Sequence, residues 1–215
     1  MSSPLLLLGY GAHSRVVADA YLSSSSAHSV CFLDDNLSSG NDGALGDIGP
    51  LIGTLNSIFD ESTISNFPSA FVAIGNPYLR MKYISILLDL GYFVPVIKHP
   101  TSVVSKFSNI QPGVFLAPHS CVQACSFIDT GCIINTSASV DHDCRLFPGV
   151  HICPGARLAG EVTVGSRSWI GIGASVIQKI IIGSDATVGA GAAVVQDVPN
   201  CVTVVGVPAR VVSSR

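Results

Sequence analysis

The residues best suited to acid–base chemistry are Asp141, His142 and Asp143, which are consecutive in the chain. Histidine is the side chain whose ordinary pKa lies nearest neutral pH, so it can accept and return a proton during a reaction. A neighbouring carboxylate can orient the imidazole and support its cation. The alternative is a solvated surface histidine without a role. The two flanking carboxylates favour a general base at His142.

A second group of residues is suited to binding an anionic ligand. The apolar run Leu5–Leu8 leads into Gly9-Tyr10-Gly11-Ala12-His13, and glycines at such a turn let backbone N–H groups approach a phosphate. Asp34-Asp35 follows a second apolar run, where a carboxylate can accept hydrogen bonds from a ribose or a base. The alternative is a degenerate turn with a solvated acidic pair, because Ser14 stands where G-x-G-x-x-G has its third glycine. Gly75-Asn76 ends a third run and favours the ligand site, because ligands bind at the carboxyl ends of strands.

A period of six residues organises the second half of the chain. From Val104 to Val194 an aliphatic residue stands at every sixth position, and a small or aliphatic residue commonly follows four places later. This period fits neither an α-helix nor an ordinary strand. It predicts a parallel β-helix whose short sides each use six residues, with the large aliphatic side chains pointing inward. Gly165, Gly171, Gly183 and Gly189, each one place after an aliphatic residue, are expected to support the turns.

Three such sides make one triangular coil, so residues 18 apart in the chain are expected to stack. His142 should then lie beneath Gly160, whose backbone N–H could stabilise an oxyanion. His151 is half a coil from His142 and is not expected to reach it within one chain. It could face the His142 of a neighbouring chain if three prisms pack around a three-fold axis. Trp169 stands one coil above His151 and is expected to pack at the contact between subunits.

The first 98 residues lack this period and alternate apolar runs with helical patterns, which predicts a Rossmann-like parallel sheet. The expected elements are strands at Leu5–Leu8, Val30–Leu33, Ala70–Ile74 and Phe93–Ile97, helices at Ala12–Leu22 and Tyr78–Leu90, and a loop at Asn36–Pro50. The sequence thus predicts a Rossmann-like α/β domain at 1–98 and a β-helix domain at 99–215. The tail from Val204 to Arg215 is expected to be an irregular or short helical cap.

Composition argues against several classes of protein. Only 12% of residues are charged and 48% are hydrophobic, which is typical of a chain that buries a large core. A net charge of -3 gives no reason to expect a nucleic-acid partner. No apolar stretch is long enough for a membrane span, and no Lys or Arg precedes Leu5–Leu8 as in a signal peptide. The seven cysteines form no C-x-x-C pair and are expected to be mostly free thiols of a cytoplasmic protein.

The chain resembles the family of sialic-acid O-acetyltransferases and nucleotide-amino-sugar N-acetyltransferases. The segments that resemble it are Gly9–Val17, Val72–Asn76, Ile134–Thr136, Val140–Cys144, His151–Gly155, Leu158–Gly160 and Gly206–Ala209. Together they extend over nearly the whole chain, and the combination of both domains is specific. Tyr10 departs from the pattern, since many relatives carry a small residue there, and it is expected to reshape the phosphate or sugar contact.

The resemblance implies a left-handed β-helix that forms a homotrimer and binds acetyl-CoA between adjacent prisms, and an N-terminal domain that holds a nucleotide sugar. Catalysis is then expected from His142, with Asp141 as its acidic partner, and from Asn135 and Gly160. Acetyl-CoA is expected to contact His151, Gly160, Gly171, Gly173 and Gly189. The nucleotide sugar is expected to contact Gly9, Gly11, Ala12, His13, Asp34, Asp35, Gly75 and Asn76. No metal is expected.

The resemblance implies N-acetylation of a UDP-, GDP- or dTDP-linked 4-amino-4,6-dideoxy sugar, as in the synthesis of lipopolysaccharide or other surface glycans. The alternative within the family is O-acetylation of a sugar hydroxyl, such as that of sialic acid, which demands more of the base. A zinc-dependent carbonic anhydrase would need three histidine ligands, whereas only His142 and His151 are candidates. A nucleotide-sensing scaffold would need no acid–base pair, and the incomplete glycine pattern disfavours a Rossmann-type oxidoreductase.

Overall fold

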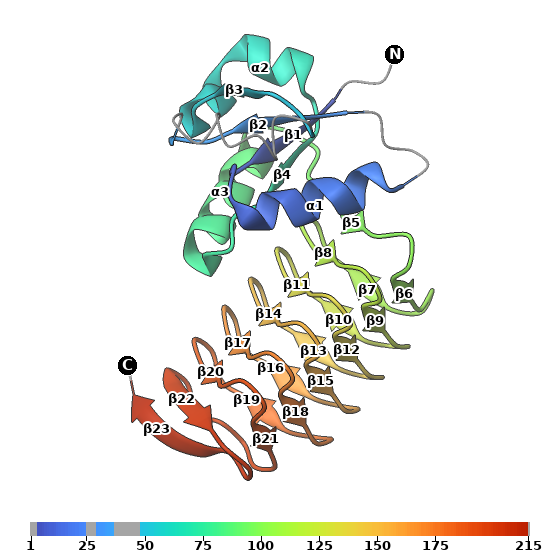
Figure 1. Cartoon of the computed structure of the whole chain (residues 1–215), viewed down its shortest axis with the longest axis vertical. Helices are drawn as coiled ribbons and strands as arrows, with labels where there is room; N and C mark the ends of the chain where they lie inside the picture. Colours follow the sequence, from blue (N-terminus) through green and yellow to red (C-terminus); the bar gives the residue numbers. More distant parts are fainter. Residues whose placement is uncertain (1–3, 25–28, 37–47, 215) are drawn as a thin grey trace. The chain divides into compact units, whose positions relative to one another are not determined.

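The computed structural model describes residues 4–24, 29–36 and 48–214 (Figure 1). The chain divides into two compact units, Met1–Pro100 and Thr101–Arg215. Most of the loop expected at Asn36–Pro50 lies outside the described residues. Among the described residues, no helix is both long and apolar enough to cross a membrane.

The first unit is an α/β unit around a four-stranded parallel sheet in the order β3-β2-β1-β4. All four leucines of β1 are buried, as expected for a central strand covered on both faces. Ile84 and Leu87 of α3 join this core. The elements are β1 (Leu5–Leu8), α1 (Ala12–Leu22), β2 (Val30–Leu33), β3 (Leu51–Gly53), the 3₁₀ helix η2 (Leu55–Phe59), α2 (Glu61–Asn66), β4 (Ala70–Val72), α3 (Pro77–Asp89) and β5 (Ile97–Lys98).

The structure confirms a strand or helix near each predicted position in this unit except one. The strand predicted at Phe93–Ile97 is wrong, because Phe93 makes only a single parallel bridge with Ser69 and the strand β5 begins at Ile97. Pro95 lies between them and has no N–H to donate to a sheet. The elements β3, η2 and α2 were not predicted from the sequence.

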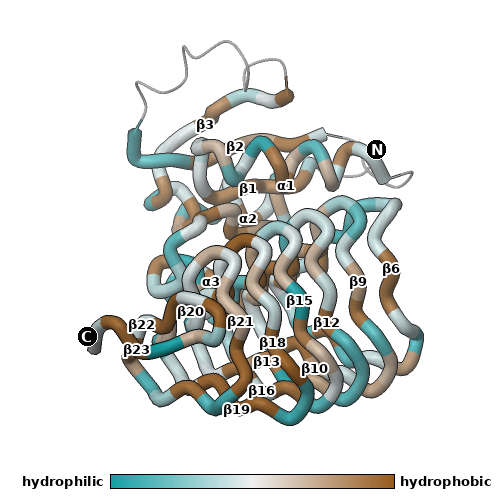
Figure 2. Tube along the Cα trace, turned by 60° about the horizontal axis from the view of Figure 1, so that its bottom comes forward, coloured by the Kyte–Doolittle hydropathy of each residue, from teal (hydrophilic) through white to brown (hydrophobic). Residues whose placement is uncertain are grey.

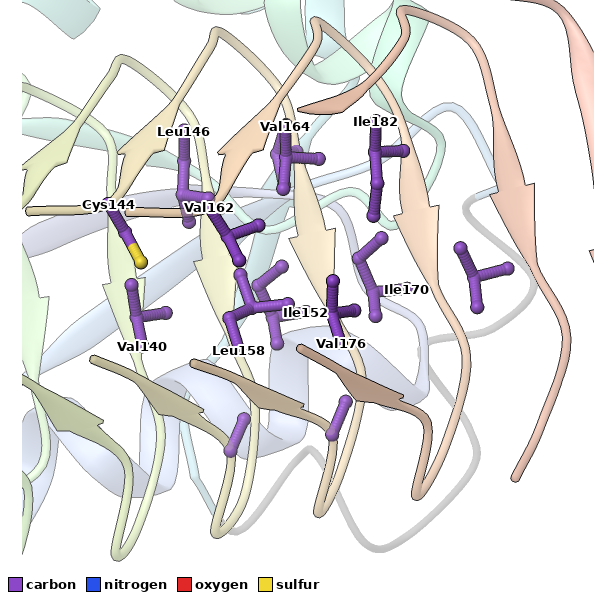
Figure 3. Close-up of a cluster of buried hydrophobic side chains, with 14 of the residues drawn as sticks. Val140, Cys144, Leu146, Ile152, Leu158, Val162, Val164, Ile170, Val176 and Ile182 are labelled. Atoms are coloured by element: carbon purple, nitrogen blue, oxygen red, sulfur yellow. The ribbon is translucent and has the colours of Figure 1, made fainter. Parts of the chain in front are cut away.

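The second unit is a parallel β-helix, as the period of six predicted. Each strand pairs in parallel with the strand one coil away, so that Val140 lies beside Leu158 and His151 beside Trp169. The residues of the six-residue series form one buried cluster, with Val104 and Ile110 packed against it at the first coil. Figure 3 shows such side chains from all three sides of the coil meeting in the interior, and Figure 2 shows hydrophobic positions recurring on successive coils.

The strands of the coil are short and regular. They are β6 (Val103–Val104), β7 (Asn109–Ile110), β8 (Phe115–Leu116), β9 (Cys121–Val122), β10 (Phe127–Ile128), β11 (Ile133–Ile134), β12 (Ser139–Val140), β13 (Arg145–Leu146), β14 (His151–Ile152), β15 (Arg157–Leu158), β16 (Thr163–Val164), β17 (Trp169–Ile170), β18 (Ser175–Val176), β19 (Ile181–Ile182), β20 (Thr187–Val188) and β21 (Ala193–Val194).

The C-terminal tail is a β-hairpin, so the prediction of an irregular or short helical cap is wrong. β22 (Val202–Val205) pairs in parallel with β20, and β23 (Arg210–Ser214) returns antiparallel to β22. The turn between them begins at Gly206, whose φ of 96° is a conformation that favours glycine. Two runs rich in β-branched residues around a Gly- and Pro-containing turn are typical of a hairpin.

Candidate active site and nucleotide pocket

His142 lies on the turn that follows β12, between two carboxylates with different partners. The His142 Nδ1 lies 2.8 Å from Asp143 Oδ2, whereas Asp141 Oδ1 accepts a hydrogen bond from the His142 backbone N–H at 2.8 Å. Asp143 itself has a φ of 57°, which aspartate tolerates better than most residues. The structure therefore places Asp143 on the imidazole ring and Asp141 on the backbone. This corrects the expectation that Asp141 orients the ring.

The charges around His142 favour its protonated form. The hydrogen bond that His142 Nδ1 donates to Asp143 is the main cause that raises the pKa of His142 above its ordinary value, and the charges of Asp141, Asp143 and Glu161 act in the same direction. Partial desolvation opposes them but does not reverse the shift. With Nδ1 facing a carboxylate, Nε2 is the nitrogen left to take a proton from another molecule.

Gly160 lies one coil above His142, as the stacking of residues 18 apart predicted. A β-carbon at Gly160 would lie 2.5 Å from both Cε1 and Nε2 of His142, so only glycine fits against the ring. The Gly160 carbonyl accepts a hydrogen bond from the Lys179 N–H at 3.0 Å, and the Glu161 N–H donates to the His142 carbonyl at 2.9 Å. Within the described residues the Gly160 N–H donates to no protein acceptor, so it can bind an oxygen of a ligand beside His142 Nε2.

Asn135 and His151 contact each other. Asn135 Nδ2 lies 3.1 Å from His151 Nε2, and Asn135 Oδ1 accepts a hydrogen bond from the Thr136 N–H at 2.8 Å. His151 is 7% exposed, and its ring packs against Trp169 with 4.2 Å between ring centroids. This fixes the His151 ring between an amide and an indole.

The glycines expected to bind acetyl-CoA have two kinds of environment. A β-carbon at Gly171 would lie 2.5 Å from the Val188 carbonyl oxygen, and one at Gly189 would lie 2.7 Å from Val205 Cγ1. Packing between coils alone therefore requires glycine at both positions. Gly173 has a φ of +66°, and a β-carbon there would meet nothing within 4 Å, which makes it a turn residue with open space beside it.

A pocket of about 330 Å³ lies at the carboxyl ends of the strands in the first unit. It is lined by Gly9, Gly11, Ala12, His13, Asp34, Ala73, Ile74 and Gly75. Gly11 is the N-cap residue of α1 and offers no side chain to its first-turn N–H groups. The pocket therefore lies at a helix N-terminus, where backbone N–H groups and the helix dipole favour an anion.

Three residues expected in this pocket or near it have structural contacts of their own. Asp35 Oδ1 accepts a hydrogen bond from the Leu55 N–H at 3.0 Å, and Asn76 Oδ1 caps α3 by accepting from the Tyr78 and Leu79 N–H groups. Tyr10 is 4% exposed and packs edge-on against Phe32. None of the three lines the pocket. The Tyr10 side chain is thus part of the core of this unit.

Asp34 lines the pocket and also holds it together. Its Oδ2 accepts a hydrogen bond from the Tyr10 N–H at 2.7 Å, which ties the end of β2 to the turn before α1. His13, which also lines the pocket, has a pKa lowered from 6.5 to about 4, because burial disfavours its charged form and the positive charge of Arg80 repels a proton. His13 is therefore neutral at physiological pH.

Comparisons with known proteins cover both units. Residues 4–87 match the model of the PglD N-terminal domain. The acetyltransferase domain of PglB from Neisseria gonorrhoeae, solved in complex with acetyl coenzyme A, is 37% identical, with 99% of this chain and all of that chain covered at a TM-score of 0.91. A second similar structure is an alanine variant of GDP-perosamine N-acetyltransferase from Caulobacter crescentus in complex with CoA and GDP-perosamine. It is 33% identical, covers 100% of this chain and 99% of that chain, and has a TM-score of 0.91.

The chain belongs to the nucleotide-amino-sugar N-acetyltransferase family. A serine acetyltransferase from Mycobacterium tuberculosis is 39% identical over 112 residues, which is 50% of this chain and 49% of that enzyme. The chain thus spans about half the length of that curated relative.

Sequence reasoning missed two features of this chain, the ring partner of His142 and the burial of Arg80. For Asp143 the available pattern was a His flanked by two acids, and only the turn geometry decides which acid meets the ring. For Arg80 the sequence shows only a basic residue in a helix, although the side chain is 1% exposed. All seven cysteines are free thiols, and among the described residues no three His, Cys, Asp or Glu side chains form a group that could hold a metal ion.

Proposed function

We propose that the chain transfers the acetyl group of acetyl-CoA to the amine of a nucleotide-linked sugar. The observation that carries this proposal is the arrangement around His142, with Asp143 on Nδ1 and with Nε2 against Gly160, whose N–H donates to no acceptor among the described residues. A base and an oxyanion donor side by side are what attack of an amine on a thioester requires.

In the proposed reaction the amine nitrogen attacks the thioester carbon, and His142 Nε2 accepts the proton that the amine loses. The Gly160 N–H stabilises the negative charge on the carbonyl oxygen in the tetrahedral intermediate. The C–S bond then breaks, and the proton on His142 passes to the departing sulfur of CoA. Asp143 holds the ring and supports the imidazolium between these two steps.

The substrate is proposed to be a 4-amino-4,6-dideoxy sugar carried on UDP, GDP or dTDP, as one similar enzyme was solved with GDP-perosamine. We place its nucleotide in the pocket lined by Gly9, Gly11, Ala12, His13, Asp34 and Gly75 of a Rossmann-like domain. Nucleotide sugars and acetyl-CoA are cytoplasmic metabolites, and seven free thiols suit that compartment, so we propose a cytoplasmic enzyme.

We further propose that the β-helix is left-handed and that three chains assemble into a homotrimer. Apolar side chains exposed on the β-helix support this assembly, among them Ile172 at 58% and Ile181 at 56% exposure. In such a trimer, His142 of one chain would face the Asn135–His151 pair of the next. Acetyl-CoA would lie in the groove between them, beside His151, Gly160, Gly171, Gly173 and Gly189.

The test compares two matched sugars on the same nucleotide, one with an amine and one with a hydroxyl at C4. With acetyl-CoA, the amino sugar is expected to release CoA thiol and to yield an amide, and the hydroxyl sugar is expected to react far more slowly. Faster transfer to the hydroxyl sugar would establish O-acetylation, the alternative activity. No thiol release with any of the UDP, GDP or dTDP amino sugars would overturn the proposed substrate class.

A further inference from the structure

The two turns that carry His142 and Gly160 are held differently from other turns of the β-helix. In the turn that precedes β12, for example, the Ala138 N–H donates to the Asn135 carbonyl at 3.0 Å, so the backbone closes the turn by itself. In the turns at 141–144 and 159–162, no backbone hydrogen bond among the described residues joins the fourth residue to the first. In each of them a buried side chain from the preceding coil bonds to the first carbonyl instead.

Ser126 holds the turn that carries His142. It is 1% exposed, and its Oγ donates to the Asp141 carbonyl at 2.6 Å and accepts a hydrogen bond from the Cys144 N–H at 3.1 Å. His142 and Asp143 lie between these two bonded residues. One buried hydroxyl therefore fixes the backbone on both sides of the proposed base, and it also fixes the backbone of Cys144.

Cys144 makes the corresponding contact one coil further along. It is 1% exposed and lies among the buried side chains of the coil (Figure 3). Its Sγ donates a hydrogen bond to the Ala159 carbonyl at 3.2 Å. Burial is the main cause that raises the pKa of the Cys144 thiol to about 11, so the thiol is protonated at neutral pH and can donate.

The Ala159 carbonyl belongs to the same peptide group as the Gly160 N–H. A peptide group is planar, so a hydrogen bond that fixes its carbonyl also fixes the direction of its N–H. A donor on the carbonyl polarises the group as well, which strengthens the N–H as a donor, and this effect is larger in a buried environment of low dielectric constant. An oxyanion donor is most effective when it is held in place before the negative charge develops.

We propose that Cys144 is a positioning residue for catalysis, whose thiol orients and polarises the peptide between Ala159 and Gly160 so that the Gly160 N–H meets the oxyanion. Ser126 anchors Cys144 from the coil below. This inference rests on the proposed function, since it takes the Gly160 N–H as the oxyanion donor. The buried, protonated thiol itself takes no part in the acetyl transfer.

The test measures kcat and both KM values of the full chain with acetyl-CoA and the amino sugar, for the wild type, Cys144→Ala and Cys144→Ser. Alanine stands at the same inward position of the repeat elsewhere, as at Ala138 and Ala156, so Cys144→Ala should fold. Its kcat should fall about 3- to 10-fold, the size expected for one lost hydrogen bond. Both KM values should change little, because the N–H acts on the transition state. Cys144→Ser should restore most of kcat, since Ser126 makes the corresponding contact through a hydroxyl.

Cys132→Ala is the matched control. Cys132 is also buried, and its Sγ donates to the Phe147 carbonyl at the same distance of 3.2 Å. Pro148 follows, so the peptide group at that carbonyl has no N–H to offer a ligand. Cys132→Ala should lower the melting temperature about as much as Cys144→Ala and leave kcat unchanged. In both variants the acidic limb of kcat/KM should stay at its wild-type pH, because neither substitution touches the imidazole or its carboxylate partner.

The possible outcomes separate this role from a structural one. An unchanged kcat in Cys144→Ala, an equal loss of kcat in Cys132→Ala, or a Cys144→Ser protein no more active than Cys144→Ala would overturn the role of Cys144. A shifted acidic limb in Cys144→Ala would overturn it too, because the loss would then come from a displaced base.

If Cys144→Ala does not fold, Cys144→Val removes the donor while filling the space, as Val162 does at the same position of the next coil. It should show the same loss of kcat, and wild-type kcat in that variant would contradict the proposal. Failure of the proposed function is a separate result. It would appear as the absence of thiol release by the wild type with every UDP, GDP and dTDP amino sugar.

Discussion

A histidine base needs its supporting carboxylate on the ring nitrogen that faces away from the substrate. In this protein Asp143 meets that need, since it lies 2.8 Å from His142 Nδ1. The Asp141 carboxylate instead accepts a hydrogen bond from the backbone N–H of His142. The sequence pattern does not distinguish Asp141 from Asp143, because one acid stands on each side of His142. The structure gives them different partners, so substituting them should have different effects on kcat.

Asp143→Asn should lower kcat by roughly 10- to 1,000-fold, because the ring loses its charged partner and its preferred tautomer. The substitution should also shift the pH dependence of kcat/KM in one direction. His142 must be neutral to act as a base, so activity falls as the pH drops through its pKa, which Asp143 raises above 6.5. In Asp143→Asn this acidic limb of kcat/KM should move to lower pH.

Asp141→Asn is the matched control for this prediction. Asparagine retains the Oδ1 acceptor for the His142 N–H, so the turn should persist and kcat should change less than in Asp143→Asn. The amine of the substrate titrates equally in all variants, so a shift between variants belongs to the enzyme. If Asp141→Asn costs more than Asp143→Asn, the assignment of the ring partner fails.

Gly160→Ala should inactivate the enzyme without unfolding it. A β-carbon 2.5 Å from His142 Cε1 and Nε2 would push the imidazole away from its position, while the φ of Gly160 lies outside the left-handed region and suits alanine. We expect kcat to fall by roughly 10²-fold or more, the contribution of a positioned base. The melting temperature and the far-UV circular dichroism spectrum are the measurements that reveal a fold defect. Unchanged kcat would show that catalysis does not depend on the ring lying against Gly160.

At the scale of the element, one coil of the β-helix decides which residues meet. The stacking of residues 18 apart brings His142 against Gly160 and His151 against Trp169. The same stacking leaves no room for a β-carbon at Gly171, 2.5 Å from the Val188 carbonyl oxygen. Glycine at this position is thus explained by coil packing, in addition to the proposed contact with acetyl-CoA.

Gly171→Ala should accordingly destabilise the β-helix by about 1–3 kcal/mol, the usual cost of overpacking a well-packed interior. The chain has a single tryptophan, Trp169, and it lies in the same coil, so its fluorescence during denaturant unfolding reports this unit. Ser175→Ala, at an exposed position of β18, serves as the control and should unfold like the wild type. Equal stability of Gly171→Ala and wild type would contradict the packing argument.

The β-helix could be predicted from the sequence because its period determines both the direction of each side chain and its neighbours in the next coil. The predicted positions of Val140, Leu158 and Val176 in the core are confirmed. The first unit was harder, because β3, η2 and α2 follow a stretch without periodicity. For the site, the sequence predicted His142 beneath Gly160. It did not predict the ring partner, the capping role of Asn76 or the burial of Arg80, since these depend on turn geometry and tertiary contacts.

At the scale of the whole molecule, the proposed active site needs two chains. His142 and Asp143 form one half, and Asn135 and His151 form the other. A chain with His142→Ala and a chain with His151→Ala should each be nearly inactive. Unfolding and refolding the two together should restore activity, because some interfaces then pair an intact His142 with an intact His151.

Random mixing of equal amounts should restore roughly a quarter of the wild-type turnover, since one interface in each mixed three-fold assembly is intact. Mixing His142→Ala with itself is the control and should restore none. Absence of recovery in trimers of verified mixed composition would show that each chain holds a complete site. A monomer at micromolar concentration in sedimentation would exclude the shared site altogether.

The measurement that tests the central claim most directly is steady-state turnover of His142→Ala with acetyl-CoA and the best nucleotide amino sugar. If His142 is the base, kcat should fall by roughly 10²–10⁴-fold while both KM values change little, because the imidazole acts mainly in the transition state. An enzyme that keeps nearly full turnover would contradict the account. The amine would then react without a protein base, and the site around His142 would serve only to align it with the thioester.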